Sequence, residues 1–327
     1  MVVKVRVYGK RQWVTRPPTN VWIDYPLKGY AEIKISNPNS YDLNDYQVRV
    51  DLTDVINTYG KSKIIIYDDS GNIIPFAYEK SNGEVTPNYS EWDTNYVWVK
   101  VPNIPANGEI SIYLAYALTD HATTGDEVFD FYDDFNNGIV DTNKWETYTV
   151  NGSIVEENGH LKLSITTTAG ESIARVLSKQ SFSLPLIVEM RFKMDGSDMD
   201  TGRHNALFWY DSNNYLRGGF DIAATDNPGQ YWHIIVIVSG SSSWNEVYDA
   251  QYDPDANWIS VKVIFKQDRG LIYKLDDGTK LEEATFNFPY ATGKVGLQHW
   301  YSASSTYTDW IRVRKYADQE PTVSLIL

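Results

Sequence analysis

Apolar and polar residues alternate with a period of two along most of the chain, which is the pattern of β-strands buried on one face. At the N-terminus, Val3, Val5 and Val7 alternate with basic residues. No segment shows the 3.6-residue period of a convincing amphipathic helix. The sequence therefore predicts an all-β protein, and turn residues divide it into two antiparallel β-sandwich domains.

The first domain follows an irregular N-terminal segment. Residues 1–29 hold a short strand and a linker that contains Pro17, Pro18 and Pro26. Residues 30–125 are predicted to form a small β-sandwich, because short alternating segments are separated there by Asn, Asp, Gly and Pro. The strands expected in it are 30–35, 46–52, 63–67, 73–79, 97–101 and 109–116.

The second domain spans residues 126–318, after a polar boundary. About ten to fourteen strands in such a length are typical of a jelly roll. The C-terminal tail, residues 319–327, ends in an apolar segment that we expect to be a final strand or a docking segment. The strands expected in the second domain include 161–166, 186–193, 206–210, 233–238, 259–266, 271–275, 294–301 and 309–316.

Charge narrows the range of partners. The 327 residues carry a net charge of −14, and residues 126–327 hold 29 acidic and 17 basic side chains. An acidic surface disfavours nucleic acid and anionic membranes as partners, whereas it suits calcium and neutral glycans. No run of about 20 apolar residues is present, so we expect no membrane insertion. The chain has no cysteine, so no disulfide is expected.

The first 16 residues form a basic arm on this acidic protein. One interpretation is a solvated terminal strand, and the other is an arm that docks on its own chain or on a neighbouring copy. In the second case, the chain self-assembles through residues 1–16 and the C-terminal tail. No apolar signal segment is evident, so we expect an extracellular, cell-surface or virion location reached after processing or by another route. The basic residues of the arm are Lys4, Arg6, Lys10, Arg11 and Arg16.

Three stretches of the first domain carry a family resemblance. They are 30–38 with 43–50, then 66–72, and then 97–106. Together they resemble an uncharacterised domain family of archaeal and bacterial surface proteins. The chain departs from that family at 112–117, where the aromatic residues are kept and the usual Gly-Asn is missing. The family has no established activity, so the resemblance implies a surface location and no mechanism.

The second domain resembles concanavalin-like jelly rolls. The matching segments are 132–135, 143–145, 157–161, 293–298 and 309–313. This fold is shared by lectins, carbohydrate-binding modules and some glycoside hydrolases, so the fold alone does not decide function. The resemblance also implies a structural Ca²⁺ held by Asp134, the carbonyl of Gly159, and Asp309. The alternative is that the two aspartates only cap strands and bind turns.

Carboxylate spacing bears on catalysis. Laminarinase-type jelly rolls place their catalytic carboxylates as Glu-x-Asp-x-x-Glu on one strand. Glu91 and Asp93 are followed by Tyr96 where the second Glu is needed, and Glu189 is followed by Arg191 where Asp is needed. We therefore predict that the chain is not an enzyme, with a glycoside hydrolase as a remaining alternative.

Aromatic residues indicate a glycan-binding face. On the strand 294–301, Val295 and Leu297 are expected to face the core, which leaves Gln298 and Trp300 on the open face. Sugars present apolar faces that complement exposed aromatic rings. The alternative is that many of these rings pack in the core. The residues expected to line the face are Trp209, Tyr215, Trp232, Trp244, Gln298 and Trp300.

These features predict a non-catalytic surface protein of a cell or virion that binds glycans as an adhesin or receptor-binding protein. A different hypothesis is a structural subunit of a filament or appendage, assembled by exchange of terminal strands between neighbouring copies.

Overall fold

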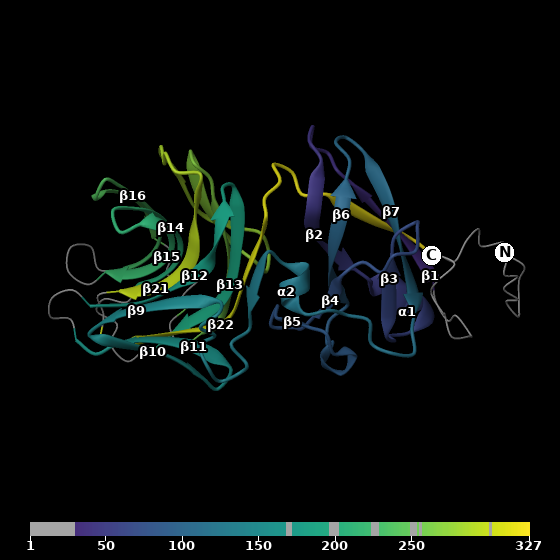
Figure 1. Ribbon diagram of the computed structural model, residues 1–327, viewed down its shortest axis with the longest axis horizontal. Coiled ribbons are helices and arrows are strands. Elements are labelled where there is room, and N and C mark those ends of the chain that lie inside the picture. Colours follow the sequence, from purple (N-terminus) through teal and green to yellow (C-terminus); the bar gives the residue numbers. More distant parts are fainter. Residues whose placement is uncertain are drawn as a thin grey trace, which may run out of the picture. The chain divides into compact units, whose positions relative to one another are not determined.

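The computed structural model describes residues 30–167, 172–195, 203–223, 229–248, 254, 257–300 and 303–327. Strands dominate it, and the strand pairs are antiparallel, which confirms the predicted all-β fold (Figure 1). The basic arm, residues 1–16, and the rest of the linker to residue 29 lie outside the described residues.

Two short α-helices interrupt the strands in the described part of the chain. They are α1 (Thr53–Tyr59) and α2 (Gly125–Val128). Neither has the length and apolarity needed to cross a membrane. Periodicity missed α1 because only Val55 of its seven residues is buried, so it has no apolar stripe for the sequence to show.

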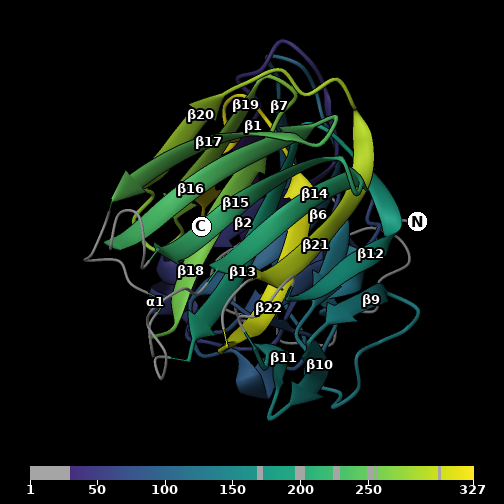
Figure 2. The same ribbon diagram turned by 90° about the vertical axis from the view of Figure 1, so that its left-hand side faces the viewer.

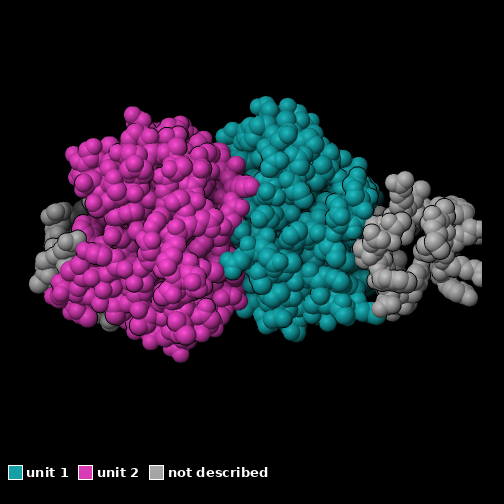
Figure 3. Space-filling view, viewed as in Figure 1, with its two compact units in different colours: residues 1–81, 85–129, 317–327 teal, residues 82–84, 130–316 magenta. Residues whose placement is uncertain are grey.

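The chain folds into two compact units (Figure 3). Unit 1 holds residues up to 81, residues 85–129 and residues 317–327, and unit 2 holds residues 82–84 and 130–316. The boundary therefore lies four residues beyond the predicted position, after Phe129. The C-terminal tail belongs to unit 1, because it adds a strand to a sheet of that unit.

Unit 1 is a sandwich of two four-stranded sheets. Its apolar side chains meet between the sheets, and Ile33, Val48, Phe76, Val99 and Leu114 are buried there. One sheet has the order β23 (Thr322–Ile326), β1 (Tyr30–Ser36), β7 (Glu109–Tyr116), β3 (Ile64–Tyr67). The other has the order β2 (Leu43–Asp51), β6 (Tyr96–Ile104), β4 (Phe76–Glu79), β5 (Val85–Thr86).

Unit 2 is a larger sandwich with the jelly-roll character that the sequence predicts. Its eight-stranded sheet is called the β13 sheet here. Seven of its strands follow one another in the order β10 (Gly152–Glu157), β11 (His160–Ile165), β22 (Ser305–Lys315), β13 (Leu186–Met194), β18 (Ile259–Phe265), β19 (Arg269–Lys274), β20 (Lys280–Thr285). The eighth strand, β8 (Phe131–Asp133), pairs with β22.

The seven-stranded sheet of unit 2, here the β14 sheet, faces the viewer in Figure 2. Its order is β17 (Ser241–Tyr248), β16 (Gly229–Val238), β15 (Asn214–Ala223), β14 (Arg203–Asp211), β21 (Thr292–Trp300), β12 (Ile173–Ser183), β9 (Trp145–Val150).

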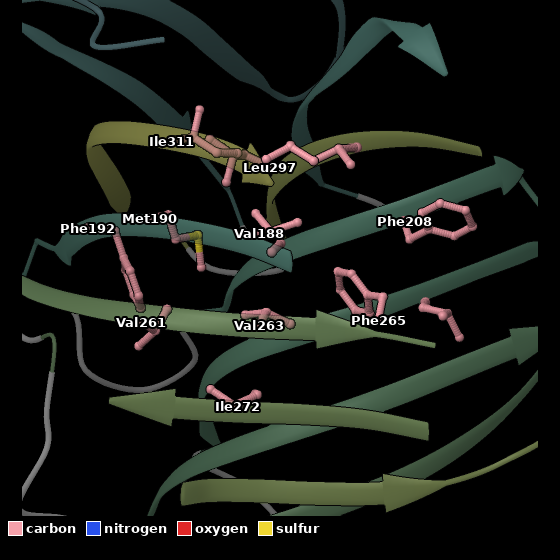
Figure 4. Close-up of a cluster of buried hydrophobic side chains, with 14 of the residues drawn as sticks. Val188, Met190, Phe192, Phe208, Val261, Val263, Phe265, Ile272, Leu297 and Ile311 are labelled. Atoms are coloured by element: carbon pink, nitrogen blue, oxygen red, sulfur yellow. The ribbon is translucent and has the colours of Figure 1, made fainter. Parts of the chain in front are cut away.

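The core of unit 2 lies between these two sheets (Figure 4). Val188 and Val263 from the β13 sheet meet Phe208 and Leu297 from the β14 sheet, and all four are fully buried. Burying one such side chain stabilises the fold by about 1.5–3 kcal/mol. Because successive side chains of a strand point to opposite faces, the chain neighbours of Phe208 and Leu297 must lie on the outer face of the β14 sheet. That outer face is the candidate site.

Candidate functional site

A row of polar side chains crosses the outer face of the β14 sheet. The strand registers place one residue from each of the seven strands directly beside the next. Four members of this row are charged or titratable, and only one has no side chain. In strand order from β9 to β17, the row is Tyr148, Arg175, Gln298, Asn205, Gly219, His233, Glu246.

Asn205, His233 and Gln298 form the floor of this face, and none exposes more than 2% of its surface. Burial, together with the nearby charges of Arg217 and Arg203, lowers the pKa of His233 well below its usual range, so the imidazole is neutral at pH 7. A 2.5 Å hydrogen bond joins His233 Nε2 to Asn205 Oδ1, and His233 is its donor because the amide oxygen can only accept. The remaining donor of Asn205, Nδ2, is buried without an acceptor among the described residues.

A stacked cluster lies on one side of the floor. The Arg175 guanidinium lies 3.9 Å from the centre of the Trp209 ring, and the Tyr215 ring stacks on Trp209 at 4.5 Å. Arg175 approaches from β12 and Tyr215 from β15, so the strand order places them on opposite sides of Trp209. Between β12 and β14, the outer face carries Gly296, which has no side chain to block the reach of Arg175.

A second cluster surrounds Trp300 at the end of β21. The guanidinium groups of Arg203 and Arg217 lie 4.8 and 4.9 Å from the centre of its ring. Arg203 is half-buried and Arg217 is buried, with 3% of its surface exposed. Cation–π contacts of this kind hold both the cation and the ring in place.

The structure brings together four of the six residues predicted to bind glycans. Trp209, Tyr215, Gln298 and Trp300 all lie on the outer face, where the three rings are half-buried. Trp232 does not, because it is fully buried in the core against Phe220. Trp244 belongs to β17, opposite Ile235, and its side chain lies outside the described part of the structure.

Sequence reasoning missed Arg175, Arg203, Arg217, Asn205 and His233. Each is a polar residue in an alternating strand, which is the pattern of an ordinary solvent-facing position. The signal that could have found them is their burial, and burial depends on neighbouring strands that are remote in sequence.

Asp309 has partners that differ from those of a calcium ligand. Its carboxylate accepts hydrogen bonds from the Arg191 guanidinium and from Asn82 Nδ2, and His160 Nδ1 lies 3.3 Å away. Asp134 accepts a hydrogen bond from the backbone of Asn136, in the manner of a turn. Within the described ranges, no three His, Asp or Glu side chains are grouped to hold a metal ion. Calcium binding by Asp134, Gly159 and Asp309 therefore stays a prediction, and it would require Asp309 to give up Arg191.

Glu189, the strand glutamate considered for catalysis, is held in an ion triplet. Its two oxygens accept hydrogen bonds of 2.6 and 2.8 Å from Arg312 and Arg314, and all three side chains are buried. Burial alone would raise the pKa of Glu189, but the two guanidinium groups lower it to about 2. A carboxyl that is ionised so firmly cannot serve as a general acid near neutral pH.

Comparison with protein families matches one part of the chain. Residues 61–148 match the family described as "Domain of unknown function (DUF2341)", so the chain contains that domain. This match fits the predicted resemblance to an uncharacterised family, while the surface location stays a prediction. No curated protein matches the sequence.

The chain is similar to solved structures of glycoside hydrolases. A glycoside hydrolase family protein from Mycobacterium thermorestibile is 13% identical, with 56% of this chain and 99% of that chain covered and a TM-score of 0.45. A β-glucanase from Bacillus licheniformis is 16% identical, with 57% and 98% covered and a TM-score of 0.43. An endo-β-1,3-glucanase from Pyrococcus furiosus is 13% identical, with 58% and 95% covered and a TM-score of 0.44.

These structures correct the prediction that the chain is not an enzyme. That prediction depended on the missing Glu-x-Asp-x-x-Glu pattern, which describes only one arrangement of catalytic carboxylates. The absence of that one spacing gives no ground for excluding hydrolysis.

Proposed function

We propose that unit 2 recognises carbohydrate through the outer face of the β14 sheet, as part of a protein that works at a cell or virion surface. The observation that carries the proposal is the outer face itself, where half-buried aromatic rings border a floor of buried hydrogen-bonding groups. Protein sites for sugars need both elements, because a sugar has apolar C–H faces and a rim of hydroxyl groups.

The two elements have separate tasks. The partly exposed ring of Trp300 offers an apolar surface to a sugar ring, while Asn205 Nδ2 is a donor that still needs an acceptor within the described part of the structure. Gln298 lies between Arg175 and Asn205 in the register and adds an amide to the floor. An unsatisfied buried donor costs about 1–3 kcal/mol, and a sugar hydroxyl that reached Asn205 would recover part of that cost.

A glycan array with matched tryptophan variants tests the proposal. Trp300→Ala should weaken binding to the best glycan by roughly 30-fold, since a central aromatic contact is worth about 2 kcal/mol. Trp258→Ala is the control, because Trp258 is a half-buried ring outside this face that contacts His160. Equal binding by the two variants, or an array without any glycan above background, would refute the proposal.

The same glycans serve to measure cleavage. Incubation of each bound polysaccharide with the protein, followed by an assay for new reducing ends, shows whether recognition is coupled to hydrolysis.

A further inference from the structure

The C-terminal strand β23 is an edge strand of unit 1. It pairs with β1 on one side and is the last strand of its sheet on the other (Figure 1). Within the described ranges no other strand pairs with it, so the backbone N–H and C=O groups of its outer edge are available to a further strand. An edge of this kind is where a strand from another chain adds to a sheet.

β23 also lacks the features that normally prevent such pairing. Its five residues are TVSLI, without a charge or a proline, and its register with β1 is continuous. The other edge strands of unit 1 are less suited to pairing. β5 has only two residues, β3 has four and bridges Ile73, and β2 carries Asp45, Arg49 and Asp51.

The core of unit 1 is incompletely covered at β23. Val323 and Leu325 pack against this core but stay partly exposed, whereas their partners on β1, Ile35 and Ile33, are fully buried. At the end of the strand, Ile326 exposes 47% of its surface. A further strand with apolar residues at every second position would cover the two partly exposed side chains and extend the core by one strand.

We propose that the N-terminal segment of a second copy, residues 2–8, adds to β23 as a fifth strand of this sheet, so that copies of the chain join head to tail. The proposal concerns unit 1 and does not depend on carbohydrate recognition by unit 2. Residues 2–8 read VVKVRVY, so three valines share one face of an extended strand and Lys4 and Arg6 share the other. The segment precedes all the described strands, which begin at Tyr30.

The two faces of this segment match the two faces of the sheet at β23. When the three valines face the core, beside Val323 and Leu325, the two basic side chains lie on the outer face. On that face β1 carries Glu32, which is opposite Ile326 in the register. The Glu32 carboxylate accepts a 2.6 Å hydrogen bond from the Ser111 hydroxyl and forms no ion pair with a basic residue of the described ranges. A lysine or arginine on the added strand would give it one.

The connecting segment favours a second copy over the same chain as the source of the strand. Tyr30 begins β1 at the end where β23 finishes, so a strand from the same chain would need only a short connection. Neighbouring antiparallel strands are usually joined by about two to five residues, whereas residues 9–29 are far longer. Fully extended, this segment spans up to about 70 Å, roughly four times the length of β23. Its prolines favour extended backbone.

Sedimentation velocity of the full-length protein over a range of concentrations tests the association. Wild type should form oligomers that grow with concentration, because head-to-tail contacts do not stop at a dimer. Val5→Asp should need at least about a 100-fold higher concentration to associate to the same degree, because it turns a charge towards the core. Val155→Asp is the control, since Val155 is an exposed valine on the edge strand β10 of unit 2, and it should associate like wild type.

Disulfide trapping identifies the two surfaces, since the chain has no cysteine of its own. One preparation carries Lys4→Cys and a second carries Ser324→Cys, two positions on the same face of the extended sheet. Arg6→Cys is used in parallel, because the register decides which of the two residues is opposite Ser324. After mixing and mild oxidation, one of these pairs should give at least about tenfold more mixed disulfide than the same arm variants give with Ser153→Cys, an exposed serine on β10.

Three results overturn the proposal. The first is a wild-type protein that stays monomeric at every concentration, and the second is association that Val5→Asp leaves unchanged. The third is a yield of mixed disulfide from Ser324→Cys that is no higher than the yield from Ser153→Cys. A single chain with both Lys4→Cys and Ser324→Cys that closes an internal disulfide, while mixed copies give none, assigns the strand to its own chain and also overturns the proposal. None of these results bears on glycan binding.

Discussion

At the scale of single residues, Glu189 is the most constrained carboxylate of unit 2. It is buried and accepts hydrogen bonds from two buried arginines, so replacing it leaves both positive charges without their partner. Removing one partner of a buried ion pair lowers the free energy of unfolding by about 3–5 kcal/mol, because the other charge stays buried without compensation. We therefore expect Glu189→Gln to lower the free energy of unfolding by about that amount at pH 7, measured by urea denaturation.

The pH dependence of the same variant gives a stricter test. The pKa of Glu189 is lowered from 4.5 to about 2, so its contribution is fully present above pH 4.5 and is lost as the pH falls towards 2. The stability difference between wild type and Glu189→Gln should shrink over that range. The control is Glu283→Gln, which removes a more exposed carboxylate on β20 and should lower the free energy of unfolding much less. A difference that is constant down to pH 2 would contradict the assigned pKa.

At the scale of elements, the edge strands of the two sheets of unit 2 are joined by a buried carboxyl. Glu282 of β20 accepts a 2.8 Å hydrogen bond from Asn245 Nδ2 of β17, and its other oxygen is buried without a partner in the described ranges. Burial raises the pKa of Glu282 from 4.5. Since the folded state favours the protonated form, this group contributes most below pH 4.5, and its contribution falls as the pH rises through the raised pKa.

Glu282→Gln should therefore stabilise the folded state at neutral pH, because the amide keeps an acceptor for Asn245 and the substitution removes a buried charge. We expect a higher melting temperature than wild type at pH 8, and a difference that narrows as the pH approaches 4, measured by calorimetry across this range. Glu246→Gln, on the exposed part of β17, should show a much smaller change. A lower melting temperature for Glu282→Gln at pH 8 would contradict this account.

At the scale of the whole molecule, the sequence predicted the positions of the strands better than the pairing between them. Alternation marks a strand locally, so most of the expected segments correspond to observed strands. The pairing of the C-terminal tail with β1, such as Leu325 opposite Ile33, joins residues almost 300 apart, and no local pattern encodes it. The candidate site could be predicted only in part for the same reason. The alternation within its own strand predicted that Trp300 lies on the open face. The contact of Arg175 with Trp209, in contrast, depends on two strands that are separated along the chain and on Gly296 between them.

The central claim is that the outer face of the β14 sheet binds carbohydrate. The most direct test is a crystal structure of the protein with an oligosaccharide cut from its best-binding polysaccharide. The account predicts a sugar ring against Trp300 and hydrogen bonds to the sugar hydroxyl groups from Asn205 Nδ2, the Arg175 guanidinium or the Gln298 amide. An oligosaccharide seated on the β13 sheet or on unit 1, with the outer face of the β14 sheet empty, would contradict it.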